Sequence, residues 1–314
     1  MDELVEIYEP IKDKLKETEE CIQQSIISEC EDVTSACKHI INAGGKRIRP
    51  ALVLLSAKVC GYKGKRDIDL ATAAELIHTA TLIHDDVIDE ASLRRGKQTL
   101  NLKFGNRRAI LTGDFLYTKA ISIILQDQSI EIMKTIFSAI SKICEGEIEQ
   151  TLRNNSREIR EEGYIEMIKN KTASFFSCCC ELGAMLGNLK NQEVSVLKTF
   201  GMNLGLAFQI VDDILDVVST NGGFGNFTLP IIYGLRQASL NERKRILKIL
   251  DKGSNEEDMK WLVNILKNYQ AIEYAKTVAK GYIDQAKDNL KTLPNCTSKD
   301  SLIKLSDFVI KRRI

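Results

Sequence analysis

The sequence predicts a single all-helical domain over residues 1–314. Only four prolines occur, and none lies between Pro50 and Pro230, an interval in which Leu, Ile, Ala, Lys and Glu dominate. Such a long stretch of good helix formers without proline is typical of packed α-helices. Because no Ser/Gly/Pro-rich run and no long block of like charge marks a linker, we expect the helices to share one core.

Residues 3–42 are expected to form two helices, and the second of them ends at the turn residues 42–45, Asn-Ala-Gly-Gly. The next helix is expected to begin within KRIRP, because Pro50 suits the first turn of a helix. Glycine lets the backbone approach a ligand, and Lys46 and Arg49 then stand at a helix N-terminus, which favours anions. Taken alone, GGKRIRP could also be an ordinary basic loop.

Two segments, 75–95 (ELIHTATLIHDDVIDEASLRR) and 208–216 (FQIVDDILD), are expected to form helices that set carboxylates among apolar residues. Carboxylates four positions apart on a helix repel, and beside Leu, Ile and Val they lose hydration, so a cation is needed to stabilise them. A single motif could equally be a solvated acidic face. Two copies favour a pair of acidic walls that hold Mg²⁺ and a diphosphate across a cavity. The predicted metal ligands are Asp85, Asp86, Asp89, Asp212, Asp213 and Asp216.

Arg94 and Arg95 follow the first acidic motif directly and precede Gly96. Arginine meets phosphate oxygens in bidentate fashion, so this pair favours a phosphate site over simple salt bridges. The combination of these arginines with the acidic motifs also favours an anion-binding role for GGKRIRP.

Composition excludes some functions. The net charge of +1 argues against nucleic acid as a partner, since no strongly basic field is present. The nine cysteines lack metal-ligand spacing, and Cys178 to Cys180 are expected to be core residues, so a reducing cytoplasm fits best. The N-terminus lacks the pattern of a signal peptide, and no stretch is expected to approach the length of an uncharged membrane span.

Taken together, the motifs resemble those of a known family. GGKRIRP, DDVIDEASLRRG, the Lys171-Thr172 pair and FQIVDDILD resemble, in order and approximate spacing, the trans-prenyl diphosphate synthases, also called polyprenyl synthetases. The resemblance covers about residues 40 to 235. Within the family, the chain resembles the medium- and long-chain members. It implies the isoprenoid synthase fold, a helical bundle around a deep central cavity. It also implies a homodimer and the Mg²⁺-dependent, head-to-tail addition of isopentenyl diphosphate to an allylic diphosphate.

The resemblance also implies roles for individual residues. Asp85 and Asp89 would bind two Mg²⁺ ions, and Asp212 would bind a third. The allylic diphosphate would be held by Arg94 and Lys171, and oxygen dipoles from Thr172 and Gln209 would shield the carbocation. Isopentenyl diphosphate would be held by Lys46, Arg49, His78 and Arg95. Without the resemblance, His78 could instead be a hydrogen-bonded core histidine.

Product length is predicted from the helix that precedes Asp85. Ala80 and Thr81 are the first side chains below the metal site, and both are small, with Ile77 one turn farther. A prenyl unit extends about as far as one helical turn, roughly 5 Å, so each missing bulky residue lets in about one more unit. Because short-chain members of the family tend to place aromatic residues near this point, the resemblance implies a product of about six or more isoprene units.

One segment departs from the family pattern. The family's Gly-Lys-x-Thr-Leu-Pro loop corresponds here to VVSTNGGFGNFTLP, residues 217–230, which is shorter and has Asn226 in place of the usual lysine. A weaker enzyme, a trimmed loop, or compensation by a partner or by the basic C-terminal end would each explain this departure. That end, Lys311 to Arg313, closes a last short helix introduced by Pro294. It is expected to be a solvated face, with coverage of the diphosphate site and peripheral contact with anionic lipid as alternatives.

Two other functions are compatible with parts of the sequence. A class I terpene cyclase would share the first acidic motif, but GGKRIRP and DDILD argue against it. A catalytically weak or regulatory subunit of a two-component prenyl synthase would explain the short loop, but the intact aspartates argue against that assignment.

Overall fold

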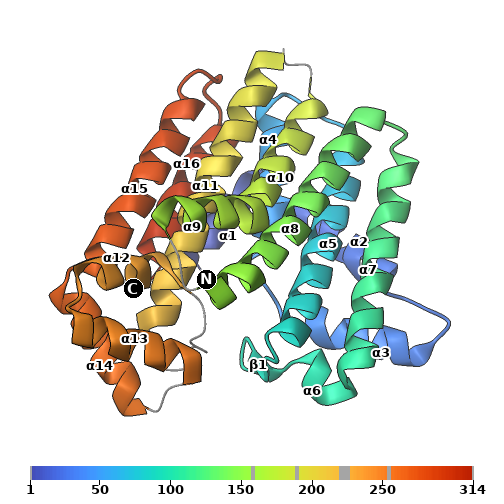
Figure 1. Ribbon diagram of the computed structural model, residues 1–314. Coiled ribbons are helices and arrows are strands. Elements are labelled where there is room, and N and C mark those ends of the chain that lie inside the picture. Colours follow the sequence, from blue (N-terminus) through green and yellow to red (C-terminus); the bar gives the residue numbers. More distant parts are fainter. Residues whose placement is uncertain (1, 157–159, 188–190, 219–226, 253–255, 313–314) are drawn as a thin grey trace. The chain divides into compact units, whose positions relative to one another are not determined.

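A computed structural model describes residues 2–156, 160–187, 191–218, 227–252 and 256–312 of the protein. Almost every element in these ranges is an α-helix (Figure 1), which confirms the predicted all-α class. The sheet found in this part of the chain is a short antiparallel hairpin, in which β1 (Leu93–Arg94) pairs with β2 (Lys97–Gln98).

The chain divides into two compact units. The first comprises Met1–Thr135, Cys179–Val194 and Asn295–Ser301, and the second comprises Ile136–Cys178, Ser195–Pro294 and Leu302–Ile314. The single domain over residues 1–314 stays a prediction.

The first unit is built on two apolar helices, α4 (Ile48–Val59) and α5 (Arg66–Ile88). Leu52 and Leu54 of α4 and Ala73 of α5 are completely buried. A helix that is hydrophobic on most sides must be covered by neighbours, and α5 packs against α2, α4 and α7. The unit's other helices include α1 (Asp2–Tyr8), α2 (Lys12–Ser25), α3 (Glu31–Ile41), α6 (Leu100–Phe104) and α7 (Asn106–Gln126).

The N-terminal segment contains three helices, so the prediction of two helices over residues 3–42 was wrong. The cause is Pro10, which lies in a 3₁₀ turn (Glu9–Ile11) between α1 and α2. Proline has no N–H to donate and interrupts a helix, and a 3₁₀ turn is a common connector at such a point. The predicted end of the last helix in this segment is confirmed, because α3 stops at Ile41 and Gly44 adopts a φ of +78°. Pro50 lies in the first turn of α4, as predicted.

The second unit contains the helices that carry the second acidic motif and Lys171. A five-residue π-helical segment, Lys169–Ala173, separates α9 from α10. π-Helical turns are rare and occur mostly at functional sites. The helices that lie wholly or mainly in this unit are α8 (Ile130–Ser156), α9 (Glu161–Ile168), α11 (Asn191–Val218), α12 (Leu229–Gln237), α13 (Leu240–Lys252), α14 (Glu256–Asn268), α15 (Ala271–Leu290) and α16 (Thr297–Lys311), whereas α10 (Ser174–Met185) is divided between the two units.

Close helix packing in the second unit depends on glycine at two points. A Cβ at Gly205 of α11 would lie 2.6 Å from the Cα of Ala173, and one at Gly146 of α8 would lie 2.5 Å from the backbone N of Lys171. Only glycine allows backbones to approach this closely. The π-helical segment is therefore packed directly against both α8 and α11.

Two sequence expectations concern apolar segments. Cys178, Cys179 and Cys180 are buried, as predicted for core residues. The expectation about membrane spans needs correction, because the Gln192–Val218 part of α11 is long and apolar enough to cross a membrane by length and composition. Half of its most apolar window is buried inside the protein, and a core helix that neighbours cover on most sides has the same composition.

Candidate active site

The first acidic motif lies at the C-terminal end of α5. Asp86 is 2% exposed, whereas Asp85 is half-buried and Asp89, just after the helix, is exposed. The guanidinium of Arg94 pairs with the buried carboxylate, with Nε 2.8 Å and Nη2 2.6 Å from Oδ1 of Asp86. A helix C-terminus is itself negative, so this arginine offsets part of the repulsion among the carboxylates. Arg94, which was predicted to hold a diphosphate, is therefore held beside the first motif by Asp86.

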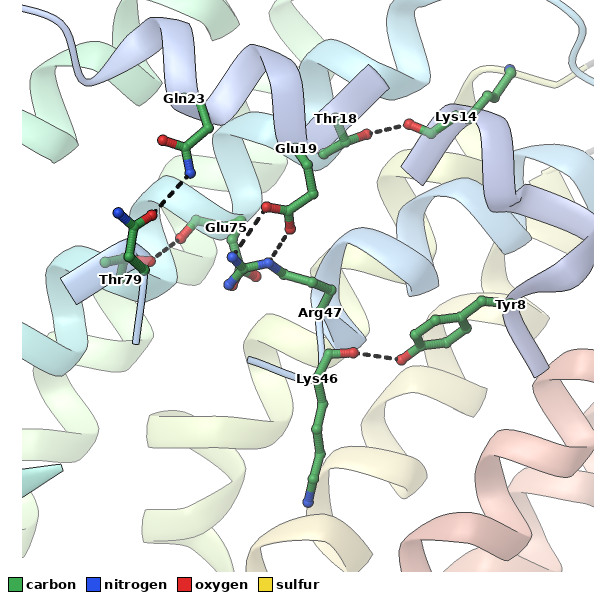
Figure 2. Close-up of polar contacts among 10 residues, drawn as sticks. Tyr8, Lys14, Thr18, Glu19, Gln23, Lys46, Arg47, Glu75 and Thr79 are labelled. Carbon is green, nitrogen blue, oxygen red and sulfur yellow. Dashed lines mark hydrogen bonds and ion pairs between the residues drawn. The ribbon is translucent and has the colours of Figure 1, made fainter. Parts of the chain in front are cut away.

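The loop from Gly44 to Ile48 leads into α4 and carries the basic residues of GGKRIRP. Arg47 has a left-handed backbone, and its side chain pairs with Glu19 of α2 and Glu75 of α5 (Figure 2). Lys46 is exposed, and its side chain points away from these carboxylates, whereas its carbonyl oxygen accepts a hydrogen bond from Tyr8 (Figure 2). The loop thus separates an inward-facing arginine from an outward-facing lysine.

Four arginines surround His78 of α5. Burial lowers the pKa of the His78 imidazole well below its ordinary value, and the positive charges of nearby Arg47, Arg49, Arg94 and Arg95 lower it further. His78 is therefore neutral at neutral pH, with one ring nitrogen to donate and one to accept. The structure brings His78 together with Arg49 and Arg95, two of its three predicted partners, in a strongly positive environment, which favours an anion.

The second unit holds Lys171, Thr172 and Gln209 in two sets of polar contacts, of which one holds Lys171 and the other reaches the second acidic motif. Lys171 Nζ lies 2.5 Å from a carboxylate oxygen of Glu147 and donates a 2.9 Å hydrogen bond to Gln150. The Thr172 hydroxyl donates to the Gln209 carbonyl oxygen at 2.7 Å, and the Gln209 amide donates to Asp213 at 2.8 Å. The three predicted catalytic side chains thus come from the π-helical segment and from α11.

Asp213 is the buried member of the second motif, at 8% exposure. Its second oxygen accepts a 2.6 Å hydrogen bond from the hydroxyl of Tyr164. Burial raises the pKa of Asp213 to about 7, the hydrogen bonds from Tyr164 and Gln209 lower it, and Asp216 and Asp212 raise it. Desolvation is the dominant cause, because the carboxylate loses water that two hydrogen bonds only partly replace.

Asp212 pairs with an arginine from the C-terminal end of the chain. Arg312, which follows α16, lies 2.6 Å from Oδ1 of Asp212, and its guanidinium stacks 4.7 Å from the ring centre of Phe208. Only 14% of the Arg312 side chain is exposed, so the expectation of a solvated basic end was wrong for this residue. Arg313 lies outside the described residues, and so do residues 219–226 with Asn226, so the predicted consequences of the short loop stay open.

The predicted product-length residues lie on α5. Ile77 and Ala80 are buried, and the Thr81 hydroxyl is turned back to donate to the His78 carbonyl at 2.8 Å. Ala80 and Thr81, five and four positions before Asp85, are both small, and the hydroxyl of Thr81 is satisfied by its own helix.

The two motifs share an arrangement that suits magnesium. In each, one aspartate is buried and paired, Asp86 with Arg94 and Asp213 with Tyr164, while the flanking aspartates keep access to solvent. Within the described ranges, no three His, Cys, Asp or Glu side chains converge tightly enough to form a metal site by themselves. Mg²⁺ commonly binds through one or two carboxylates plus water and substrate phosphates, so these accessible oxygens fit it.

Sequence reasoning missed four polar residues of this site. Glu147 and Gln150 hold Lys171, Tyr164 holds Asp213, and Arg312 holds Asp212. Glu147 and Gln150 stand three positions apart on α8 and so share a helix face, which is a signal the sequence does contain. Tyr164 and Arg312 are far along the chain from their partners and carry no local signal.

The similarity of this chain to known proteins is consistent with the residues found at the site. A family model described as polyprenyl synthetase matches residues 30–266, a range that holds both acidic motifs and the basic loop. The chain is 35% identical to the short chain isoprenyl diphosphate synthase of Methanothermobacter thermautotrophicus, over 96% of this chain and 98% of that protein. It is 34% identical to heptaprenyl diphosphate synthase component 2 of Bacillus subtilis, over 98% of this chain and 90% of that protein.

Among solved structures, the chain is similar to the polyprenyl synthase from Caulobacter crescentus CB15 complexed with calcium and isoprenyl diphosphate. The TM-score is 0.95 at 30% identity, and the match covers 99% of this chain and 98% of that one.

Proposed function

Because the chain belongs to the polyprenyl synthetase family and is a trans-prenyl diphosphate synthase, we propose that it makes a medium- or long-chain all-trans polyprenyl diphosphate. In the proposed reaction, isopentenyl diphosphate is added head to tail to an allylic diphosphate. The observation that carries the proposal is the pair of similarly built acidic motifs, each with accessible carboxylates beside a buried, paired one.

The accessible aspartates of the two motifs are proposed to hold Mg²⁺, which when bound would neutralise charge that develops on the departing diphosphate. Asp85 and Asp89 offer their carboxylates one helical turn apart, and Asp212 and Asp216 do so on α11. The buried aspartates have a different part, because Asp86 orients Arg94 and Asp213 orients Gln209. Calcium and isoprenyl diphosphate in the Caulobacter crescentus structure support the choice of a divalent cation and of a prenyl substrate.

The basic residues are proposed to bind the two diphosphates. Arg49, His78 and Arg95 belong to the positive cluster of the first unit, and this cluster, together with the exposed Lys46, would hold isopentenyl diphosphate. Lys171 and Arg94 would hold the allylic diphosphate. In this structure Lys171 and Arg94 are each paired with a protein carboxylate. A diphosphate with several negative charges would compete with that carboxylate for the same cation.

Thr172 and Gln209 are proposed to stabilise the carbocation. The Thr172 hydroxyl hydrogen is directed at Gln209, so the negative end of its dipole is left for a positive centre. Because the Gln209 amide is fixed on Asp213, the pair is oriented before substrate binds. The proton lost after carbon–carbon bond formation is proposed to leave with the released diphosphate.

The experiment that tests the proposal is elongation by the purified chain. With Mg²⁺, labelled isopentenyl diphosphate and farnesyl diphosphate, we expect labelled polyprenyl diphosphates. Asp85→Asn is expected to lower the rate at least about 100-fold, whereas Asp284→Asn, on the surface of α15, is expected to leave it unchanged. Absence of elongated product under every metal and primer condition would exclude the proposal.

A second candidate is a subunit of a two-component synthase. The observation in its favour is the likeness to a Bacillus subtilis protein whose name is component 2 of heptaprenyl diphosphate synthase. The same assay separates the two candidates, because a subunit would show turnover only after a second polypeptide is added.

A further inference from the structure

We propose that Arg47 is a positioning residue, which Glu19 and Glu75 hold so that Lys46 and Arg49 meet the diphosphate of the non-allylic substrate. The inference rests on the proposed function and deepens it, because it names the device that shapes the basic loop. Lys46, Arg47 and Arg49 belong to one short segment, yet Lys46 is exposed whereas the Arg47 side chain is largely buried.

Arg47 is committed to protein carboxylates (Figure 2). Its Nη1 donates to Glu75 Oε1 at 2.8 Å, its Nη2 donates to Glu19 Oε2 at 3.2 Å, and its Nε also donates to Glu19. The side chain is 13% exposed, and the side chain of Glu75 is 6% exposed. A guanidinium that uses its fork on two carboxylates of α2 and α5 has little capacity left for a substrate anion.

The backbone of Arg47 shows why this commitment matters. Its φ of +51° and ψ of +35° lie in the left-handed region, which a residue with a Cβ rarely adopts. The side-chain contacts to two helices are the interactions that stabilise this conformation. In this conformation the Lys46 side chain points away from the carboxylates, and the Tyr8 hydroxyl fixes the Lys46 carbonyl at 2.9 Å (Figure 2).

Glu75 also balances the charge of the arginine cluster. Burial and the neighbouring Arg47 and Arg94 lower the pKa of Arg95, whereas Glu75 raises it. A Cβ at Gly45 would lie 2.9 Å from Nη1 of both Arg47 and Arg95, so the two guanidiniums stand close together over this glycine. Without the Glu75 carboxylate they would repel, and the cluster would open. The Glu75 carboxylate thus allows the cationic side chains to stay close together at the loop, while the positive charge of Arg47 neutralises that carboxylate.

A purely structural salt bridge makes different predictions from a positioning device. Loss of a purely structural salt bridge lowers thermal stability and does not change the KM of one substrate more than the KM of the other. Loss of a positioning bridge raises the KM of one substrate, here isopentenyl diphosphate, more than that of the other. The test therefore compares the two KM values with kcat and with binding in the absence of turnover.

The experiment uses Arg47→Gln, Glu75→Gln and the conservative Arg47→Lys in the full chain. We expect KM for isopentenyl diphosphate to rise about tenfold in the first two, with the allylic KM changed less than about twofold. Arg47→Lys is expected to recover part of the loss, because it keeps the charge but not the fork. Arg66→Gln is the matched control, since Arg66 makes a bidentate pair with Asp127 away from this loop and its loss is expected to leave both KM values unchanged.

Calorimetric titration of isopentenyl diphosphate alone gives a readout that is independent of product formation. A tenfold weaker affinity in Arg47→Gln supports the inference even if the wild-type chain forms no product, so its failure is distinguishable from that of the proposed function. Unchanged affinity in a folded Arg47→Gln variant, or an equal rise of both KM values, would overturn it. If Arg47→Gln does not fold, Glu19→Gln and Tyr8→Phe remove single contacts of the same loop and decide the question in the same way.

Discussion

Gly146→Ala adds one methyl group where α8 packs against the π-helical segment that carries Lys171. The new Cβ would lie 2.5 Å from the backbone N of Lys171, 2.8 Å from its Cα and 2.9 Å from its Cβ. Ordinary contacts begin at 3.4 Å, and two of these three atoms are backbone atoms that cannot rotate away. The two segments must therefore separate by about 1 Å.

This separation acts on the atoms that hold Lys171. Glu147 and Gln150, the partners of its Nζ, lie on α8 itself, so a shift of α8 moves them relative to the Lys171 backbone. Overpacking of this kind costs about 1–3 kcal/mol, against which alanine gains up to about 1 kcal/mol over glycine in a helix. A displacement of about 1 Å at a substrate-binding group can lower the rate about 100-fold.

The assay measures kcat for elongation of farnesyl diphosphate together with the midpoint of thermal unfolding. We expect Gly146→Ala to lower kcat by about 10- to 100-fold and to lower the midpoint by about 2–4 °C. Gly281→Ala in α15 is the matched control, because a Cβ there meets nothing within 4 Å. It is expected to raise the midpoint and leave kcat unchanged. If Gly146→Ala behaves like Gly281→Ala, the close packing does not position Lys171.

Three further predictions concern other parts of the site. Because burial raises the pKa of Asp213 to about 7 from 3.8, its contribution to the stability of the metal-free protein is complete below pH 3.8 and is lost as pH rises through 7. Chemical unfolding at pH 6 and pH 8 should therefore show lower stability at pH 8, and Asp213→Asn should remove part of that difference; an identical pH dependence in both proteins would refute this. Ala80→Phe is expected to shorten the product by about one or more isoprene units, since a phenyl ring replaces a buried methyl group, and an unchanged product ladder would show that this face of α5 does not limit the chain. The expected homodimer is tested by sedimentation: Leu111, 59% exposed on α7 beside Ile110, is proposed to lie against a second copy, so Leu111→Glu should yield monomers, whereas a monomeric wild type would contradict the dimer.

Local chemistry in the sequence predicted part of this structure. The start of α4 at Pro50, the turn at Gly44 and the positions of both acidic motifs follow from residues that act on their own neighbours. Pro10 carried the same kind of signal, and the division of the N-terminal helices at this residue was nevertheless missed. Such features are accessible to sequence reasoning because helix ends are decided within a few residues.

The partners of the site residues were not predictable in the same way. Arg47 contacts carboxylates 28 positions away on either side, and Tyr164 reaches Asp213 over 49 positions. Nothing in the spacing of charged residues distinguishes Arg47 from Arg49, although both lie near His78 and Arg47 also pairs with the carboxylates of two helices. These pairings depend on tertiary packing, which brings α2, α5 and the basic loop together.

The central proposal is that accessible aspartates of both motifs bind divalent cations around one allylic diphosphate. Its most direct test is the anomalous scattering of Mn²⁺ in crystals grown with a thiolo analogue of farnesyl diphosphate. We expect Mn²⁺ peaks at Asp85 and Asp89 and a further peak at Asp212, all in contact with the same diphosphate. Metal at only one motif, or a separate diphosphate at each motif, would contradict the account.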